Sequence, residues 1–184
     1  MSNDVSLTRK TGLELVNLRG QPESAAFTAA IEDVFGMALP RTPNTVERGP
    51  AYTALWLGPD EWLLRSNEPR LSTAERSLRP RLAGEFAAVV DLSSGYAVLE
   101  LAGARVREVL RRGCPLDVHP GVFGPGQCAQ SHYFKAGITL RPLAPDTYEL
   151  IVRRSFAEYA ARMLLHDSPL AVTQPGSQLT MHST

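Results

Sequence analysis

The apolar residues of this chain occur in short segments, and their spacing alternates between the period of a strand and that of a helix. Short apolar segments bounded by glycine, proline or aspartate are typical of strands. This pattern predicts strands at residues 13–18, 53–57, 61–65, 87–91, 97–101, 127–133, 137–140 and 147–152.

Apolar residues spaced by three, four and seven positions predict helices between these strands, because such residues share one helix face. Three such faces are Phe27, Ala30, Ile31 and Val34; Val106, Val109 and Leu110; and Phe156, Tyr159, Ala160, Met163 and Leu164. Ser72 and Glu75 predict the start of another helix, since serine followed by glutamate three residues later can form a capping box. Ser155 and Glu158 predict the same box at the start of the last helix.

The chain is predicted to form one domain between two tails. Residues 1–11 and 169–184 have little periodic apolar content, which is typical of tails. Residues 40–51 contain three prolines and a glycine and are predicted to be a loop. The domain then spans residues 12–168, and a chain of 184 residues can bury roughly 70% of its unfolded surface.

The order strand, helix, hairpin, helix occurs twice in this domain. The matching segments are Gly20 with Gly103 and 72–75 with 155–158 at an offset of 83 residues, 58–62 with 144–148 at 86, and 36–40 with 113–117 at 77. Coincidence is the alternative, because Gly, Pro, Ser and Glu recur at element ends for local reasons. We predict an α+β fold of two duplicated units, about 12–84 and 87–168, packed as one body because neither unit covers both faces of its strands.

Composition narrows the class of partner. Nineteen basic and nineteen acidic side chains give a formal net charge of zero, which argues against nucleic acid as the main partner. No apolar run approaches the roughly 20 residues of a membrane span, so no membrane partner is expected. The first residues lack the apolar segment of a signal peptide, which predicts a cytoplasmic protein.

Motifs for catalysis and metal binding are missing. The chain has no glycine-rich dinucleotide loop, no phosphate loop with its lysine and no nucleophile elbow. Cys114 and Cys128 are separated by fourteen residues and the four histidines are scattered singly, whereas tetrahedral zinc needs four closely spaced donors. The glycine-rich stretch at 121–126 contains Pro125, which removes an N–H that a phosphate site would use. We therefore predict no catalytic residue and no metal site.

A few residues remain candidates for ligand or partner contacts. Asp91 could present its carboxylate to a ligand, but aspartate and serine before a glycine favour a tight turn. Arg153 and Arg154 precede a helix, where positive charge is unfavourable, so they either meet carboxylates on a partner or form a solvated pair. Trp62 follows the turn at 58–60 and is either a core residue or a contact anchor.

Five segments together resemble the gamma subunit of heterotetrameric sarcosine oxidase. The resemblance extends over about residues 12–168. The segments are Leu-Trp-Leu-Gly-Pro-Asp-Glu-Trp-Leu-Leu at 55–64, Val-Asp-Leu-Ser-Ser-Gly at 90–95, Arg-Gly-Cys-Pro-Leu-Asp at 112–117, Gly-Pro-Gly-Gln-Cys-Ala-Gln at 124–130, and Val-Arg-Arg-Ser-Phe-Ala-Glu-Tyr at 152–159.

This resemblance implies a fold and a setting. The family is distantly similar to the folate-binding domain of aminomethyltransferases, the glycine-cleavage T-proteins, whose fold is a duplication of two small α+β halves. The implied setting is a bacterial cytoplasmic oxidoreductase of alpha, beta, gamma and delta chains that acts on the CH–NH group of sarcosine. It releases glycine, passing electrons through flavins to oxygen and the one-carbon unit to tetrahydrofolate. In that family FAD, FMN and NAD belong to the larger chains, folate to alpha and zinc to delta, and gamma has no known catalytic residues.

Two functional hypotheses follow. The first is a non-catalytic structural subunit of sarcosine oxidase in direct contact with alpha, with Trp62, Arg153 and Arg154 as predicted contact residues. The alternative is a stand-alone folate-binding or aminomethyltransferase-like protein. Asp91 is the loose candidate for a folate contact in that case.

Overall fold

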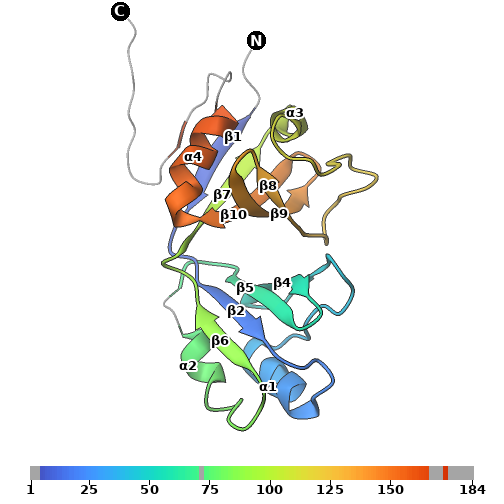
Figure 1. The fold of residues 1–184 in the computed structure, drawn as a ribbon, viewed down its shortest axis with the longest axis vertical. Helices are drawn as coiled ribbons and strands as arrows, with labels where there is room; N and C mark the ends of the chain where they lie inside the picture. Colours follow the sequence, from blue (N-terminus) through green and yellow to red (C-terminus); the bar gives the residue numbers. More distant parts are fainter. Residues whose placement is uncertain (1–4, 71–72, 166–171, 174–184) are drawn as a thin grey trace, which may run out of the picture.

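Two β-sheets face each other and carry helices on their outer sides (Figure 1). The computed structural model describes residues 5–70, 73–165 and 172–173. Sheet I has the order β3 (Val46–Arg48), β4 (Tyr52–Gly58), β5 (Glu61–Ser66), β2 (Leu15–Arg19) and β6 (Ala88–Asp91). Sheet II has the order β11 (Val172–Thr173), β1 (Ser6–Lys10), β7 (Tyr96–Ala102), β10 (Thr147–Arg153), β9 (Ala136–Ala144) and β8 (Ala129–Tyr133).

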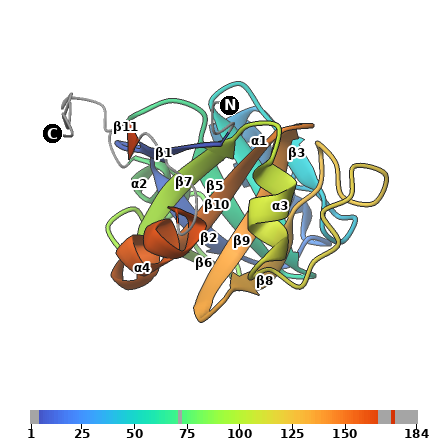
Figure 2. The same ribbon diagram turned by 90° about the horizontal axis from the view of Figure 1, so that it is seen from above.

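The helices complete a four-layer arrangement. Helices α1 (Ala25–Phe35) and α2 (Ala74–Leu78) pack on sheet I, and α3 (Val106–Arg111) and α4 (Arg154–Leu165) pack on sheet II. Figure 2 shows α3 and α4 lying over the strands of sheet II. No helix of the described residues is long and apolar enough to cross a membrane.

Strand register relates the two sheets through the offsets found in the sequence. In sheet I, Leu15 of β2 pairs with Arg65 of β5. Adding the offsets of 83 and 86 residues to these two positions gives Val98 and Ile151, which pair with each other in sheet II. The register irregularity before Gly58 in β4 recurs before Ala144 in β9. The fold is therefore a duplicated α+β body, as the sequence predicted.

Each half gives its first strand to the sheet of the other half. Strand β1 precedes β2 in the sequence but pairs with β7, and β6 precedes β7 but pairs with β2. The prediction of a tail at 1–11 is wrong for residues 6–10, because Val5 and Leu7 are buried in the core. The residues after Leu7 are polar, and only one face of this short strand is buried. The strand therefore has too few apolar positions to be recognised from the sequence.

Some other predicted boundaries also change. The predicted loop at 40–51 contains β3, in which Val46 pairs with Leu55 of β4. The predicted tail at 169–184 lies largely outside the described residues, but its residues 172–173 form β11 and pair with β1. Ser72, the first residue of one predicted capping box, lies outside the described residues as well. At the other predicted capping box, of Ser155 and Glu158, helix α4 begins one residue earlier, at Arg154, and the Glu158 carboxylate accepts a hydrogen bond from Arg162 at 3.2 Å.

Local signals account for the ends of α1. The Ser24 side chain accepts a hydrogen bond from the Phe27 N–H at 3.2 Å, which satisfies one of the free N–H groups of the first turn. At the other end Gly36 has φ 64°, and its N–H donates to the Glu32 carbonyl at 2.8 Å. Glycine reaches this left-handed conformation without strain, which favours the end of the helix at this residue.

Buried apolar side chains form three layers. One cluster lies between sheet II and its helices, and a second lies between sheet I and its helices. The third fills the space between the sheets and consists of Leu15, Leu55, Leu63, Val98, Cys128 and Ile151. Each fully buried side chain of leucine size contributes roughly 1.5–3 kcal/mol, so this central layer holds the two halves together as one body.

Candidate functional site

Arg154 holds the connection between β6 and β7. Its Nε donates to the Ser94 carbonyl at 2.5 Å, and its terminal nitrogen donates to the carbonyls of Ser93 at 3.3 Å and Tyr96 at 3.4 Å. Its backbone N–H donates to the Gly95 carbonyl at 2.8 Å. The structure thus gives Arg154 an internal role, and its partner contact stays a prediction because the residue is also exposed.

Asp91 organises the same connection. Its Oδ1 accepts hydrogen bonds from the Ser93 N–H at 2.8 Å and from the Ser93 hydroxyl at 2.5 Å. The same Ser93 hydroxyl oxygen accepts the Leu15 N–H at 3.0 Å, which ties the turn to β2. This is the turn geometry that the residue pattern favoured, with two hydrogen bonds already accepted by Oδ1.

Arg153 points to the surface beside two aromatic side chains. Its guanidinium lies 6.0 Å from the centre of the Tyr96 ring, at the outer limit of a cation–π contact. Phe156, the third residue of α4, is 39% exposed and lies with Arg153 and Tyr96 along a cavity of about 310 Å³. No carboxylate of the described residues pairs with Arg153, so this cavity, which we call the Arg153 groove, offers a free cation next to aromatic surface.

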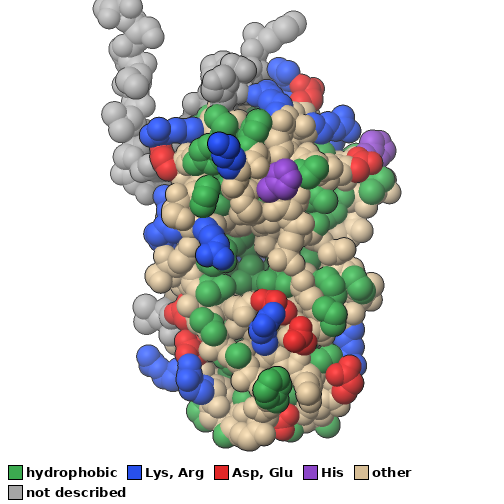
Figure 3. Space-filling view, in the orientation of Figure 1, with side chains coloured by type: hydrophobic (Ala, Val, Ile, Leu, Met, Phe, Trp, Pro, Cys, Tyr) green, Lys and Arg blue, Asp and Glu red, His purple; other side chains and the backbone are tan. Residues whose placement is uncertain are grey.

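On the face shown in Figure 3, hydrophobic side chains lie at the waist between the two halves and also over both halves, interspersed with charged groups.

Trp62 is a core residue, and its predicted role as a partner contact is wrong. The side chain is fully buried, and its indole N–H donates to the Pro40 carbonyl at 2.8 Å. The ring packs against Phe27 with 6.0 Å between ring centres. Strand β5 turns Trp62 toward α1, so no partner can reach it.

A charged cluster lies between the two sheets and was missed at the sequence level. The Glu149 carboxylate of β10 is fully buried and accepts hydrogen bonds from Arg65 of β5 and Arg141 of β9, both at 2.7 Å. Burial lowers the pKa of Arg65, although Glu149 opposes this shift. Each oxygen of the carboxylate accepts one of these hydrogen bonds, so the cluster joins the two sheets, while the Nε of Arg65 is buried without a hydrogen-bond partner among the described residues.

A second buried carboxylate, Glu14, caps α2 from outside that helix. Its Oε1 accepts the N–H groups of Thr73 and Ala74, each at 2.7 Å, and its Oε2 accepts the Tyr52 hydroxyl at 2.5 Å. Burial, followed by the hydrogen bond to Glu14, raises the pKa of Tyr52. A charged residue inside an apolar segment, between Leu13 and Leu15, was the signal that could have identified it.

Among the described residues, the cysteines and histidines do not gather into a metal-binding group. Cys114 and Cys128 are both free and buried, and burial raises the pKa of Cys128 to about 11. Among the described residues there is no group of three or more His, Cys, Asp or Glu that could hold a metal ion. His119 accepts the Gly121 N–H at 3.1 Å within its own loop.

Solved structures show the same fold. The glycine cleavage system aminomethyltransferase T from Bartonella henselae matches with a TM-score of 0.70 at 14% identity, over 93% of this chain and 48% of that protein. At this identity the match shows the fold, which is that of a duplicated aminomethyltransferase-type α+β protein. A chain of the heterotetrameric sarcosine oxidase from Corynebacterium sp. U-96 matches with a TM-score of 0.81 at 29% identity, over 90% of this chain and 84% of that one.

Sequence relatives identify the family. The model of the sarcosine oxidase, gamma subunit family matches residues 19–169. Sarcosine oxidase subunit gamma from Corynebacterium sp. (strain P-1) is 34% identical over 82% of this chain and 73% of the relative. The subunit from strain U-96 is 34% identical over 88% of this chain and 76% of the relative. The chain belongs to the sarcosine oxidase gamma subunit family.

Proposed function

We propose that this chain is a non-catalytic subunit of a cytoplasmic heterotetrameric sarcosine oxidase, in which it makes direct contact with the alpha subunit and supports assembly. The complex would demethylate sarcosine oxidatively to glycine and pass the one-carbon unit to tetrahydrofolate. FAD, FMN, NAD, folate and zinc would be bound by the other subunits. Family membership together with the Arg153 groove supports this proposal.

The distribution of polar groups supports a role in assembly. Among the described residues, the buried charged side chains Glu14, Arg65, Arg141 and Glu149 all have partners inside the fold. Arg153 instead lies beside exposed aromatic surface with no described carboxylate as partner. Arginine next to aromatic side chains is enriched at protein interfaces.

Co-expression tests the proposal. The alpha, beta and delta subunits from the same organism are produced with and without this chain, and the assembled particle is measured by size-exclusion chromatography with light scattering. We expect the chain to co-purify with alpha and the yield of the complete particle to fall when it is omitted. A chain that is soluble alone and never co-purifies would contradict the proposal.

Calorimetric titration with tetrahydrofolate tests the alternative of a stand-alone folate protein. We expect no micromolar binding by the isolated chain, because the Asp91 carboxylate is used by Ser93 within its turn. Micromolar binding that is lost in the Asp91→Ala variant would support the alternative and overturn our assignment of the cofactor to another subunit.

A further inference from the structure

The two halves differ at a pair of equivalent sheet edges. Strands β1 and β6 occupy the same position in sheets II and I, each beside the first long strand of the half. The outer side of β1 pairs in parallel with β11, through Leu7 with Val172 and Thr8 with Thr173. No strand of the described residues pairs with the outer side of β6. The chain therefore covers one edge with a strand of its own and leaves the other without a paired strand.

Backbone groups of β6 point away from the sheet at this open edge. The Leu92 N–H donates toward β2, to the Leu15 carbonyl at 2.7 Å, and the Asp91 N–H donates the other way, to the Glu75 side chain at 3.3 Å. Because these directions alternate along a strand, the N–H and C=O of Val89 point outward on the same side as those of Asp91. Unpaired groups at a sheet edge can pair with an added strand.

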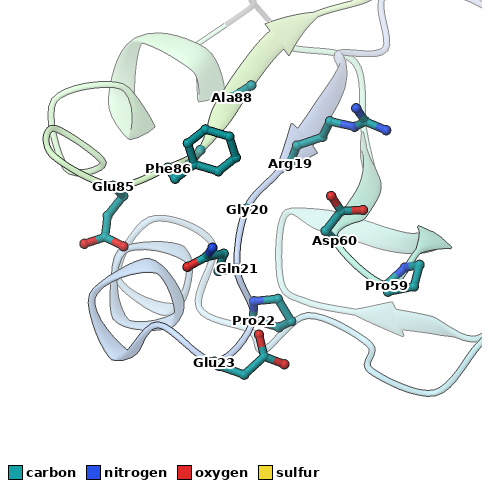
Figure 4. Close-up of a pocket in the computed structure, with 11 residues that line it drawn as sticks. Arg19, Gly20, Gln21, Pro22, Glu23, Pro59, Asp60, Glu85, Phe86 and Ala88 are labelled. Carbon is teal, nitrogen blue, oxygen red and sulfur yellow. The ribbon is translucent and has the colours of Figure 1, made fainter.

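A cavity of about 620 Å³ lies beside the start of β6. The ring of Phe86 lies at this cavity (Figure 4) and is 87% exposed. Val90, further along the strand, is 48% exposed. The carboxylates of Glu23, Asp60 and Glu85 line the cavity. Such a combination of exposed apolar surface and negative charge is suited to a ligand that is both apolar and basic.

The equivalent carboxylate in the other half already has a basic partner. Gly20 and Gly103 donate their N–H groups to the carbonyls of Asp60 and Asp146, at 3.1 and 2.9 Å, so the two aspartates are equivalent. The Asp146 carboxylate pairs with Arg107 at 3.0 Å, whereas Asp60 forms no ion pair with any described residue.

The other charged groups in the lining leave the cavity with an acidic excess. Glu23 forms no ion pair with the described residues, and Glu85 accepts a hydrogen bond from the Ser24 hydroxyl at 2.6 Å. Arg19 in the lining forms its ion pair with Glu61, at 2.8 Å, and its charge also interacts with Asp60 without a direct ion pair. The first half thus lacks both the added strand and the basic side chain that the second half obtains from its own chain.

We infer that the open edge of β6 and the adjoining cavity bind an extended segment of a partner subunit, which pairs with β6 in parallel and carries an arginine or lysine next to an apolar residue. This inference rests on the proposed function. The segment's backbone bonds to Val89, its basic side chain meets Asp60 and Glu23, and its apolar side chain packs on Phe86.

Binding of variants to the co-expressed partner subunits tests this site. Phe86→Ser should raise the Kd at least about tenfold, because an exposed aromatic anchor is lost without disturbing the core. Asp60→Asn should raise the Kd about three- to tenfold and weaken its dependence on salt. The matched control is Val122→Ser, which removes another exposed apolar side chain, 59% exposed, from the other half of the chain and should leave the Kd unchanged.

Hydrogen exchange of the wild-type chain gives a second readout that needs no variant. Deuterium uptake in residues 86–91 should be slower in the complex than in the free chain, because the Val89 N–H becomes paired. If the wild-type chain binds its partners, but Phe86→Ser leaves the Kd unchanged or the complex shows the same uptake at 86–91 as the free chain, this inference is wrong while the proposed function stands. Absence of any wild-type binding to the other subunits would overturn the proposed function and this inference with it.

Discussion

Glu149 shows how a single buried residue joins the two halves of the chain. Its carboxylate binds Arg141 from a neighbouring strand in its own sheet and Arg65 from the opposite sheet. The sequence indicated that residue 149 lies in a strand, but the strand pattern alone cannot reveal which charges meet across a sheet interface. Burial of these charges depends on the packing of both sheets, and this is why the cluster could not be predicted from sequence.

Removal of the Glu149 charge should destabilise the whole fold. In the Glu149→Gln variant, Arg65 and Arg141 remain buried without a counter-charge, and we expect the free energy of unfolding to fall by about 3–5 kcal/mol. Urea denaturation followed by circular dichroism measures this change. Glu158→Gln is the control, because its pair with Arg162 is exposed and is worth less than about 1 kcal/mol. Equal stability of the two variants would contradict the structural role of Glu149.

Cys128 should make stability fall at alkaline pH. Burial raises the pKa of this thiol from 9.0 to about 11, so above pH 9 the unfolded chain loses the proton while the folded chain keeps it. The unfolded state then binds fewer protons, and the stabilising contribution, on the order of 2 kcal/mol, is lost between pH 9 and pH 11. Urea denaturation at several pH values should show a smaller loss over this range for Cys128→Ala than for wild type. Identical pH profiles would show that the thiol does not titrate differently in the two states.

The order of the elements and the pairing register of the strands were largely predictable from the sequence, whereas the exchange of first strands between the two halves was not. The offsets of 83 and 86 residues relate the strands of the two sheets, and the helix faces at 27–34 and 106–110 pack as predicted. Strands β1 and β3 were missed because they are short and have few buried positions. The direction of the connections that follow β1 and β6 decides which sheet each strand joins. The local spacing of apolar residues carries no information about that direction.

Gly20 is required where β2 meets α1. A Cβ at this position would lie 2.2 Å from the Phe27 ring, so Gly20→Ala must displace a buried aromatic side chain. We expect a loss of about 1–3 kcal/mol in the free energy of unfolding. Gly137→Ala in β9 is the matched control, because nothing lies within 4 Å of its Cβ. Thermal unfolding of both variants checks this difference, and a Gly20 variant as stable as the Gly137 variant would contradict the close packing at this junction.

At the scale of the whole molecule, the buried charged side chains are paired inside the fold, whereas Arg153 forms no ion pair with a described carboxylate. Family membership and the resemblance at 55–64 and 152–159 both led to the sarcosine oxidase gamma subunit. Of the predicted contact residues, Trp62 is buried, and Arg154 is used by the β6–β7 connection. The sequence identified the arginine pair, and the fold shows that Arg154 also has an internal role, while both arginines stay predicted contacts.

Arg153 should contribute to assembly without contributing to stability. We expect Arg153→Ala to raise the Kd for the co-expressed partner subunits about tenfold, since an arginine beside aromatic surface is typical of an interface anchor. Its free energy of unfolding should stay within about 0.5 kcal/mol of wild type. Arg162→Ala on α4 is the control, because it removes an arginine that is 74% exposed and paired with Glu158. A tenfold effect in the control, or none at Arg153, would place the interface elsewhere.

Native mass spectrometry of the co-expressed subunits tests the central claim most directly. The account predicts a particle that contains one copy each of alpha, beta and delta together with one copy of this 20.1 kDa chain. A particle of alpha, beta and delta that forms in full yield while this chain stays free at 20.1 kDa would contradict it.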